Sequence, residues 1–144
     1  MMNKPRYFRL EEFLESSTAR QKSIQNSPSW ETIGHLNELA LFLDGMRDAW
    51  GSGIKVTSGF RNEDLNSAVG GVETSAHMSG YAADIVPSNG RFDAFVGFLK
   101  IWLKDKDWDQ CLIEENKRKG TRWVHFGLRN RKGEQRRQLF NMSV

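Results

Sequence analysis

The segment from Thr57 to Asp84, TSGFRNEDLNSAVGGVETSAHMSGYAAD, organises the rest of this chain. It contains His77 and Asp84, and Gly80 between them permits the positive φ of a tight turn. His125 follows later, in RWVHFGL. Two histidines and an aspartate supply the nitrogen and oxygen ligands that zinc favours, and three protein ligands leave one position open. These residues indicate an open metal site, although they also fit one buried structural histidine and one surface histidine.

Hydrophobic periodicity predicts where the helices lie. Apolar residues recur at three- and four-residue steps over Trp30–Trp50 and again over Arg91–Leu103, which predicts two amphipathic helices. Ser29 precedes the first helix and Gly51 follows it, as helix boundaries favour. A shorter helix is expected over Tyr7–Leu14, and SSTAR and QNSPS after it predict an irregular segment.

Alternating apolar and polar residues predict short strands. We expect a loop or a single turn over residues 61–71. The expected strands cover residues 54–60, 84–87, 109–115, 122–129 and 138–144. The third and fourth strands are joined as a hairpin by the basic loop NKRKGT, and the last closes an edge of the sheet. Helices come mainly early in the chain and strands mainly late, which predicts an α+β fold. A small antiparallel sheet would carry the metal site, with helices packed on it.

Length and composition indicate a single domain over residues 1–144. The chain is 38% hydrophobic, which is enough to bury a core without covalent staples. Cys111 is its single cysteine, so an internal disulfide is excluded. No stretch has the apolar run of a signal peptide or of a membrane span. We therefore expect the protein to be synthesised in the cytoplasm, so that reaching a target outside the membrane would require another component to deliver it. We also expect a monomer.

Basic residues crowd the last thirty positions although the net charge is only +3. They are Lys117, Arg118, Lys119, Arg122, Arg129, Arg131, Lys132, Arg136 and Arg137. These are either solvated charges of a hairpin or a face that attracts nucleic acid or an anionic polymer such as cell wall. We favour the first interpretation and expect no nucleic-acid partner.

Two motifs near the candidate ligands carry a family resemblance. S-x-H-x-x-G-x-A-x-D runs from Ser75 to Asp84, and W-x-H runs from Trp123 to His125. Together with SGFRNEDLNSAVGG at residues 58–71, they resemble the zinc D-Ala-D-Ala carboxypeptidases, a group that includes VanY-like and VanX-like peptidases and phage L-alanyl-D-glutamate endolysins. The likeness runs from about Tyr7 to Gly127 and implies the fold that this group shares with the hedgehog signalling domain.

The resemblance implies a metal centre in this chain. One zinc ion would be held by His77, Asp84 and His125, with water in the fourth position. Manganese, cobalt and nickel accept the same ligands, so the sequence leaves the native metal open.

The resemblance also implies substrate-binding residues. Arg61 would bind the substrate's carboxylate or polarise the scissile carbonyl, because a guanidinium stays charged and donates two parallel hydrogen bonds. Its alternative role is to tether the loop as a surface arginine. Ser75 and Asn66 resemble residues that shape the loop around the ligands, and Trp123 completes the substrate-binding set.

The general base is where the sequence departs from much of the family. Many members carry an acid three residues before the last histidine, where this chain has Arg122. Short phage-type members place a glutamate in a D-x-x-x-x-E arrangement, which here runs from Asp109 to Glu114. The spacing favours Glu114, with Glu115 in reserve if the strand register shifts by one residue.

The function that the resemblance implies is zinc-dependent hydrolysis of peptidoglycan stem peptides. The target would be the D-Ala-D-Ala end or an internal L-Ala-D-Glu or cross-bridge bond, and the protein would be a phage or prophage cell-wall hydrolase acting after release or within a virion. The alternative is a catalytically inactive, zinc-containing module that binds cell wall or has a structural role. A nucleic-acid-binding domain that uses the basic cluster is a third and weaker reading.

Overall fold

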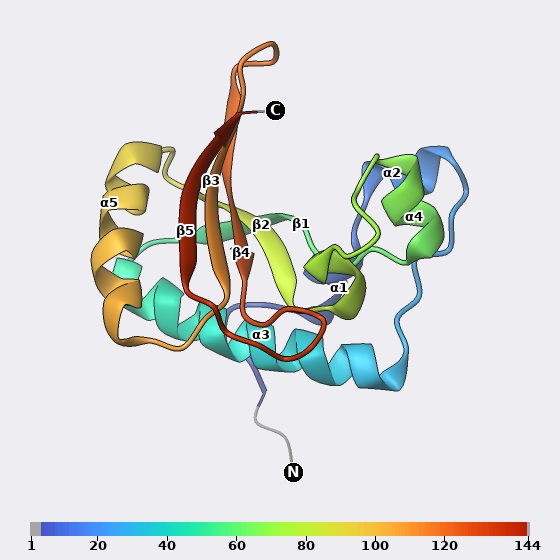
Figure 1. Ribbon diagram of the computed structural model, residues 1–144, viewed down its shortest axis with the longest axis horizontal. Helices are drawn as coiled ribbons and strands as arrows, with labels where there is room; N and C mark the ends of the chain where they lie inside the picture. The colour runs from blue at the N-terminus through green and yellow to red at the C-terminus, as the bar shows by residue number, and fades with distance from the viewer. Residues whose placement is uncertain (1–3, 144) are drawn as a thin grey trace.

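A five-stranded sheet forms the centre of the fold in the computed structural model, which describes residues 4–143 (Figure 1). Its strand order is β1-β2-β4-β3-β5. The strands are β1 Ile54–Ser58, β2 Ala82–Pro87, β3 Gln110–Asn116, β4 Thr121–Gly127 and β5 Gln138–Ser143. Together with the helices they confirm the predicted α+β fold.

The sheet is mixed rather than purely antiparallel. β1, β2, β4 and β3 pair antiparallel in turn, as predicted. β5 closes the edge but pairs parallel with β3, with Gln110 opposite Gln138. The direction follows from the chain path, because β4 ends at Gly127 beside Gln110 and the loop after it returns to the end of the sheet where β3 begins.

Two long helices provide most of the helical core. α3, Trp30–Trp50, crosses below the strands in Figure 1, and α5, Phe92–Trp102, stands beside them at the left. The side chain of Ser29 caps α3 by accepting a hydrogen bond from the Thr32 amide, and Gly51 ends the helix at φ 78°. The predicted boundaries of α3 are therefore confirmed, and the cap residues explain them.

The core lies between these helices and one face of the sheet. α3 contributes Leu39, Leu43 and Met46, which are fully buried, and β4 contributes Val124 and Phe126. Alternation along β4 leaves Trp123 and His125 on the opposite face.

Short elements make up the remainder. They are α1 Leu10–Leu14, α2 Ser17–Gln21, α4 Glu63–Ala68 and the 3₁₀ helices η1 Ala76–Ser79 and η2 Leu103–Asp105. The irregular segment expected after α1 is wrong in part, because Ser16 accepts a hydrogen bond from the Ala19 amide and caps α2. Among residues 4–143, no helix is both long and apolar enough to cross a membrane.

Candidate metal centre

Three elements bring the predicted ligands together. Asp84 on β2 and His125 on β4 are direct cross-strand partners, so their side chains share one face of the sheet. His77 lies on η1, which leads into β2 through Gly80 at φ 82°. A Cβ on Gly80 would lie 2.9 Å from a side-chain carbon of Thr32 and 3.0 Å from its carbonyl oxygen. Glycine therefore allows η1 to lie against α3 and to place His77 over the sheet.

The three donor atoms have the spacing of a tetrahedral metal site. His77 Nε2 lies 3.1 Å from His125 Nδ1 and 3.4 Å from an Asp84 carboxylate oxygen, and His125 Nδ1 lies 3.2 Å from that oxygen. Zinc bonds of 2.0–2.1 Å in a tetrahedron separate neighbouring ligands by about 3.3 Å. The donor set therefore fits zinc in both chemistry and spacing.

Hydrogen bonds orient His77 for this role. Its Nδ1 lies 2.7 Å from the Gly59 carbonyl oxygen, which can only accept, so Nδ1 carries the proton and Nε2 keeps its lone pair toward the other ligands. The His77 amide donates to Ser75 Oγ, and the His77 carbonyl accepts from the Arg61 amide. Ser75 and Arg61 thus help to fix η1 as well as lining the site.

The electrostatics favour the protonation states that a metal needs. Burial lowers the pKa of His77 below its usual value, more than nearby Asp84 raises it. Burial alone would raise the pKa of Asp84, but His77 and His125 outweigh it and hold that pKa well below the ordinary range. A neutral imidazole and an ionised carboxylate are the forms that bind metal.

A cleft of about 590 Å³ opens around the three candidate ligands. Its lining includes the predicted Arg61, Ser75, Glu114 and Trp123. The Nε of Arg61 is buried and has no hydrogen-bond partner among the described residues, and its Nη2 donates to Ser75 Oγ at 3.1 Å. The side chains of Trp123 and Arg61 both lower the pKa of the Glu114 carboxyl, by less than burial raises it.

The two candidate bases lie in different surroundings. Glu114 is opposite Trp123 in the β3–β4 register and borders the cleft. Burial and the nearby Asp84 raise the pKa of the Glu114 carboxyl above its usual value. Glu115 borders a second pocket beside α5, whose lining also includes Arg122 and Glu114, but it does not border the cleft. The register thus brings Glu114 into the cleft with the ligands and leaves Glu115 outside it.

Asn66 is buried next to the cleft and is not part of its lining. It is 3% exposed, and its side-chain nitrogen donates to the Val72 carbonyl while its backbone carbonyl accepts from the Gly71 amide. Asn66 therefore shapes the loop that forms one wall of the cleft.

The cleft lining also includes residues to which the sequence motifs assign no role in the site. Among them are Gln110, Leu112, Asn130, Arg136 and Met142. Of these, Arg136 appeared in the sequence only as one member of a basic cluster. No local pattern marks the position, because it reaches the cleft through a loop that returns across the sheet.

Comparison with known proteins agrees with this geometry. The family model described as Peptidase M15 matches residues 6–125, a range that holds all three candidate ligands and both candidate bases. No curated protein matches the chain significantly. The match covers most of the chain and agrees with the motifs at Ser75–Asp84 and Trp123–His125, so the chain belongs to the M15 peptidases, the family of the zinc D-Ala-D-Ala carboxypeptidases.

Proposed function

We propose that this protein is a zinc peptidase that cuts peptidoglycan stem peptides, with His77, Asp84 and His125 as ligands and Glu114 as general base. The observation that carries the proposal is the set of three donor atoms 3.1–3.4 Å apart in a cleft that also holds a carboxylate of raised pKa. Membership of the M15 peptidases supports a peptide substrate and a metallopeptidase activity.

The residues of the cleft divide the chemistry of peptide hydrolysis between them. When bound, zinc supplies a Lewis acid that polarises the scissile carbonyl and lowers the pKa of a water molecule toward about 7. The Glu114 carboxylate accepts the proton of the attacking water and returns it to the leaving amine nitrogen. Arg61 and Trp123 line the cleft, and the Arg61 guanidinium donates to a carboxylate or carbonyl oxygen of the substrate and holds it in place.

The position of Arg122 supports the choice of Glu114. Arg122 forms an ion pair with Asp93 of α5, 2.8 Å long, and its guanidinium lies over the ring of Phe92. An acid at position 122 in this register would also lie on the α5 side of the sheet and outside the cleft. Arg122 therefore does not stand in the place of a general base within the cleft.

The finer substrate assignment rests on the resemblance of the motifs to short phage-type members. It covers the D-Ala-D-Ala end of the stem peptide, the internal L-Ala-D-Glu bond or a cross-bridge bond, cut by a phage or prophage cell-wall hydrolase. Each of these bonds gives a product of different mass, so one digestion distinguishes them.

The deciding experiment is digestion of purified peptidoglycan and defined muropeptides, with and without chelator, read by mass spectrometry. We expect a chelator-sensitive product whose mass identifies the bond. Glu114→Gln should lower kcat by a factor of about 10² to 10⁴ while zinc content stays at the wild-type level, since a general base contributes about that much. Glu115→Gln, the matched control, should keep wild-type activity.

Two outcomes would contradict the proposal. Full activity in Glu114→Gln together with loss in Glu115→Gln would assign the base to the other carboxylate. A zinc-loaded wild type that releases no product from any wall, yet binds it in a metal-dependent way, would instead identify a binding module.

A further inference from the structure

The cleft extends beyond the metal centre on the side away from the proposed base. Leu112 of β3 is the cross-strand partner of His125, and Glu114 and Gln110 lie two residues to either side of it. Two strand residues span roughly 7 Å. The lining near Gln110 is therefore about as far from the metal ligands as Glu114 is, in the opposite direction along β3.

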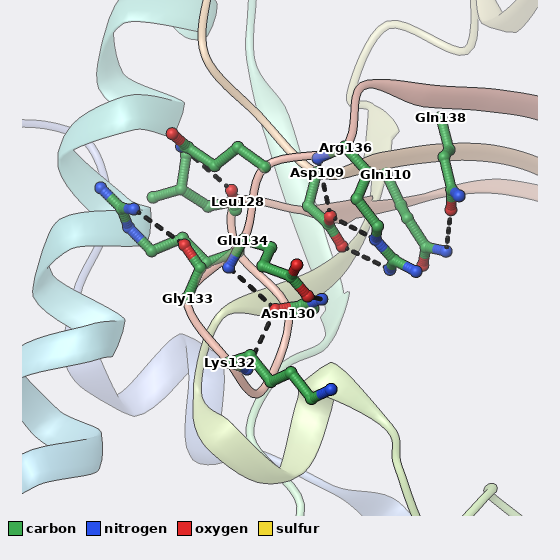
Figure 2. A network of polar contacts seen from close by, with 11 residues as sticks. Asp109, Gln110, Leu128, Asn130, Lys132, Gly133, Glu134, Arg136 and Gln138 are labelled. Atoms are coloured by element: carbon green, nitrogen blue, oxygen red, sulfur yellow. Dashed lines mark hydrogen bonds and ion pairs between the residues drawn. The ribbon is translucent and has the colours of Figure 1, made fainter.

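Asp109 and Arg136 line this part of the cleft. Figure 2 shows the contacts between them. Asp109 is 1% exposed, and its two carboxylate oxygens accept hydrogen bonds of 2.8 Å from Nε and Nη2 of Arg136. The Arg136 amide donates to the same carboxylate at 3.0 Å. These hydrogen bonds hold the Arg136 guanidinium in a fixed position before any ligand binds.

The pairing leaves part of the guanidinium available. Two of the five N–H groups of Arg136 are used by Asp109, which leaves three that do not face that carboxylate. The side chain is 41% exposed and lines both the metal cleft and an adjoining depression of about 600 Å³. Asp109 thus holds Arg136 in place without covering it.

A braced loop adds further positive charge beside Arg136. The Asn130 side-chain oxygen accepts from the amides of Lys132 and Glu134, and its nitrogen donates to the Glu134 carboxylate (Figure 2). Arg131 and Lys132 are exposed and line the depression. The depression is lined by three basic side chains and by one acid, Glu134, so the surface next to the cleft carries a net positive charge.

This wall of the cleft comes from a segment that follows the family match. The match ends at residue 125, whereas Asn130, Arg131, Lys132 and Arg136 come after it. The metal ligands, Arg61 and Glu114 lie within the match. The cationic wall therefore lies outside the region that the family match covers.

We propose that Arg136, with Arg131 and Lys132 at the mouth, binds a carboxylate of the peptide substrate on the side of the metal opposite Glu114. The inference rests on the proposed function and deepens it. An extended peptide spans about 3.3–3.6 Å per residue, so the recognised carboxylate belongs to a group one to three residues from the scissile bond. The substrate class is a stem peptide with a free carboxylate there, either on its D-glutamate or at its C-terminus.

The test compares matched peptides that differ only in that charge. One pair of stem pentapeptides carries D-glutamate or D-isoglutamine at the second position, and a second pair ends in a carboxylate or a carboxamide. The wild type should cleave the acid of one pair with a kcat/KM at least about tenfold above its amide, since a charge-assisted hydrogen bond contributes that much. The pair that shows the preference identifies the source of the carboxylate.

Variants assign the preference to Arg136. Arg136→Gln should reduce it to less than about twofold, because the carboxylate of the acid peptide then has lost its cationic partner. Because this change strips a buried Asp109 of its partner, Asp109→Asn/Arg136→Gln is the second variant and should give the same result with a neutral pair. The control is Arg137→Gln, because Arg137 is paired with exposed Asp107 and lies outside the cleft lining.

Failure of this inference differs from failure of the proposed function. A wild type that cleaves acid and amide equally in both pairs would overturn the carboxylate subsite and leave the peptidase intact. If no peptide is cleaved, the proposed hydrolysis is wrong, and calorimetric titration of the zinc-loaded wild type then decides about the subsite. Tighter binding of an acid peptide that Arg136→Gln abolishes would support it, and equal dissociation constants would overturn it.

Discussion

Asp109 shows how one residue can serve both stability and the site. Burial by itself raises the pKa of its carboxyl, but the hydrogen bonds from Arg136 outweigh this and hold the pKa below the ordinary 3.8. The same ion pair ties the loop before β5 to the start of β3. A single carboxylate therefore fixes the position of the edge strand and of the arginine that lines the cleft.

This pairing predicts a specific loss of stability in acid. A lowered pKa in the folded state contributes stability that is present above about pH 4 and is lost as the pH falls through the folded pKa. Asp109→Asn should thus be less stable than the wild type at pH 7, by about 1–3 kcal/mol, and the difference should shrink below pH 4. Urea unfolding of metal-free protein between pH 7 and pH 3 measures this.

Asp107→Asn is the matched control for that experiment. Asp107 also pairs with an arginine, Arg137, but its side chain is 78% exposed, so its removal should cost little at any pH. A stability difference for Asp109→Asn that stays constant down to pH 3 would contradict the account.

At the scale of elements, η1 is where a ligand depends on packing by a helix. His77 and Gly80 both belong to the turn that leads from η1 into β2, and Gly80 faces Thr32 and Leu36 of α3. The position of a metal ligand is thus set by the contact between η1 and α3. A disturbance at that contact should reach the metal.

Gly80→Ala should therefore weaken both folding and metal binding. The new Cβ meets Thr32 at 2.9 Å in a backbone of φ 82°, and steric overlap and the positive φ together cost about 2–4 kcal/mol. Chemical denaturation measures the stability, and competition with a chromophoric chelator measures the zinc affinity. We expect both to fall.

Gly90→Ala separates the two causes. Gly90 has a similar φ of 76°, but a Cβ there meets nothing within 4 Å, so only the backbone cost of about 1–2 kcal/mol applies. Its zinc affinity should equal that of the wild type. Equal effects of the two substitutions on zinc affinity would show that the contact with α3 does not position His77.

At the scale of the whole molecule, the metal ligands link separate parts of the chain. His77 precedes β2, Asp84 lies within it, and His125 is on β4, so a bound ion would join η1 to two strands of the sheet. An unfolded chain does not hold the three donors together. Metal binding and global stability should therefore be coupled.

Zinc should raise the stability by an amount set by its affinity. At a free concentration one hundred times the dissociation constant, the gain is about 2.7 kcal/mol. For a chain of this size, the corresponding rise in Tm is roughly 5–10 °C. Thermal unfolding with zinc and with chelator measures it. His125→Ala should show little of this shift, and an equal shift in that variant would place the metal elsewhere.

The sequence by itself determined the two long helices and the strands and pointed to the residues of the candidate site, but it did not determine the short helices α2 and α4. The boundaries of α3 follow from Ser29 and Gly51, and alternation places His125 on the face opposite Val124 and Phe126. These features depend on neighbouring residues, so they can be read along the chain. The motifs around His77 likewise identified the family that the match to residues 6–125 confirms.

Only the tertiary structure decided the parallel direction of β5 and the place of Arg136 in the cleft. The direction of β5 follows from the end of the sheet at which the loop after β4 enters it. The place of Arg136 depends on its contact with Asp109, 27 residues away. The strand register likewise brings Glu114 rather than Glu115 to the metal ligands. Local propensity does not encode where a returning loop docks, because that is settled by burial of one carboxylate with its arginine once the sheet has formed.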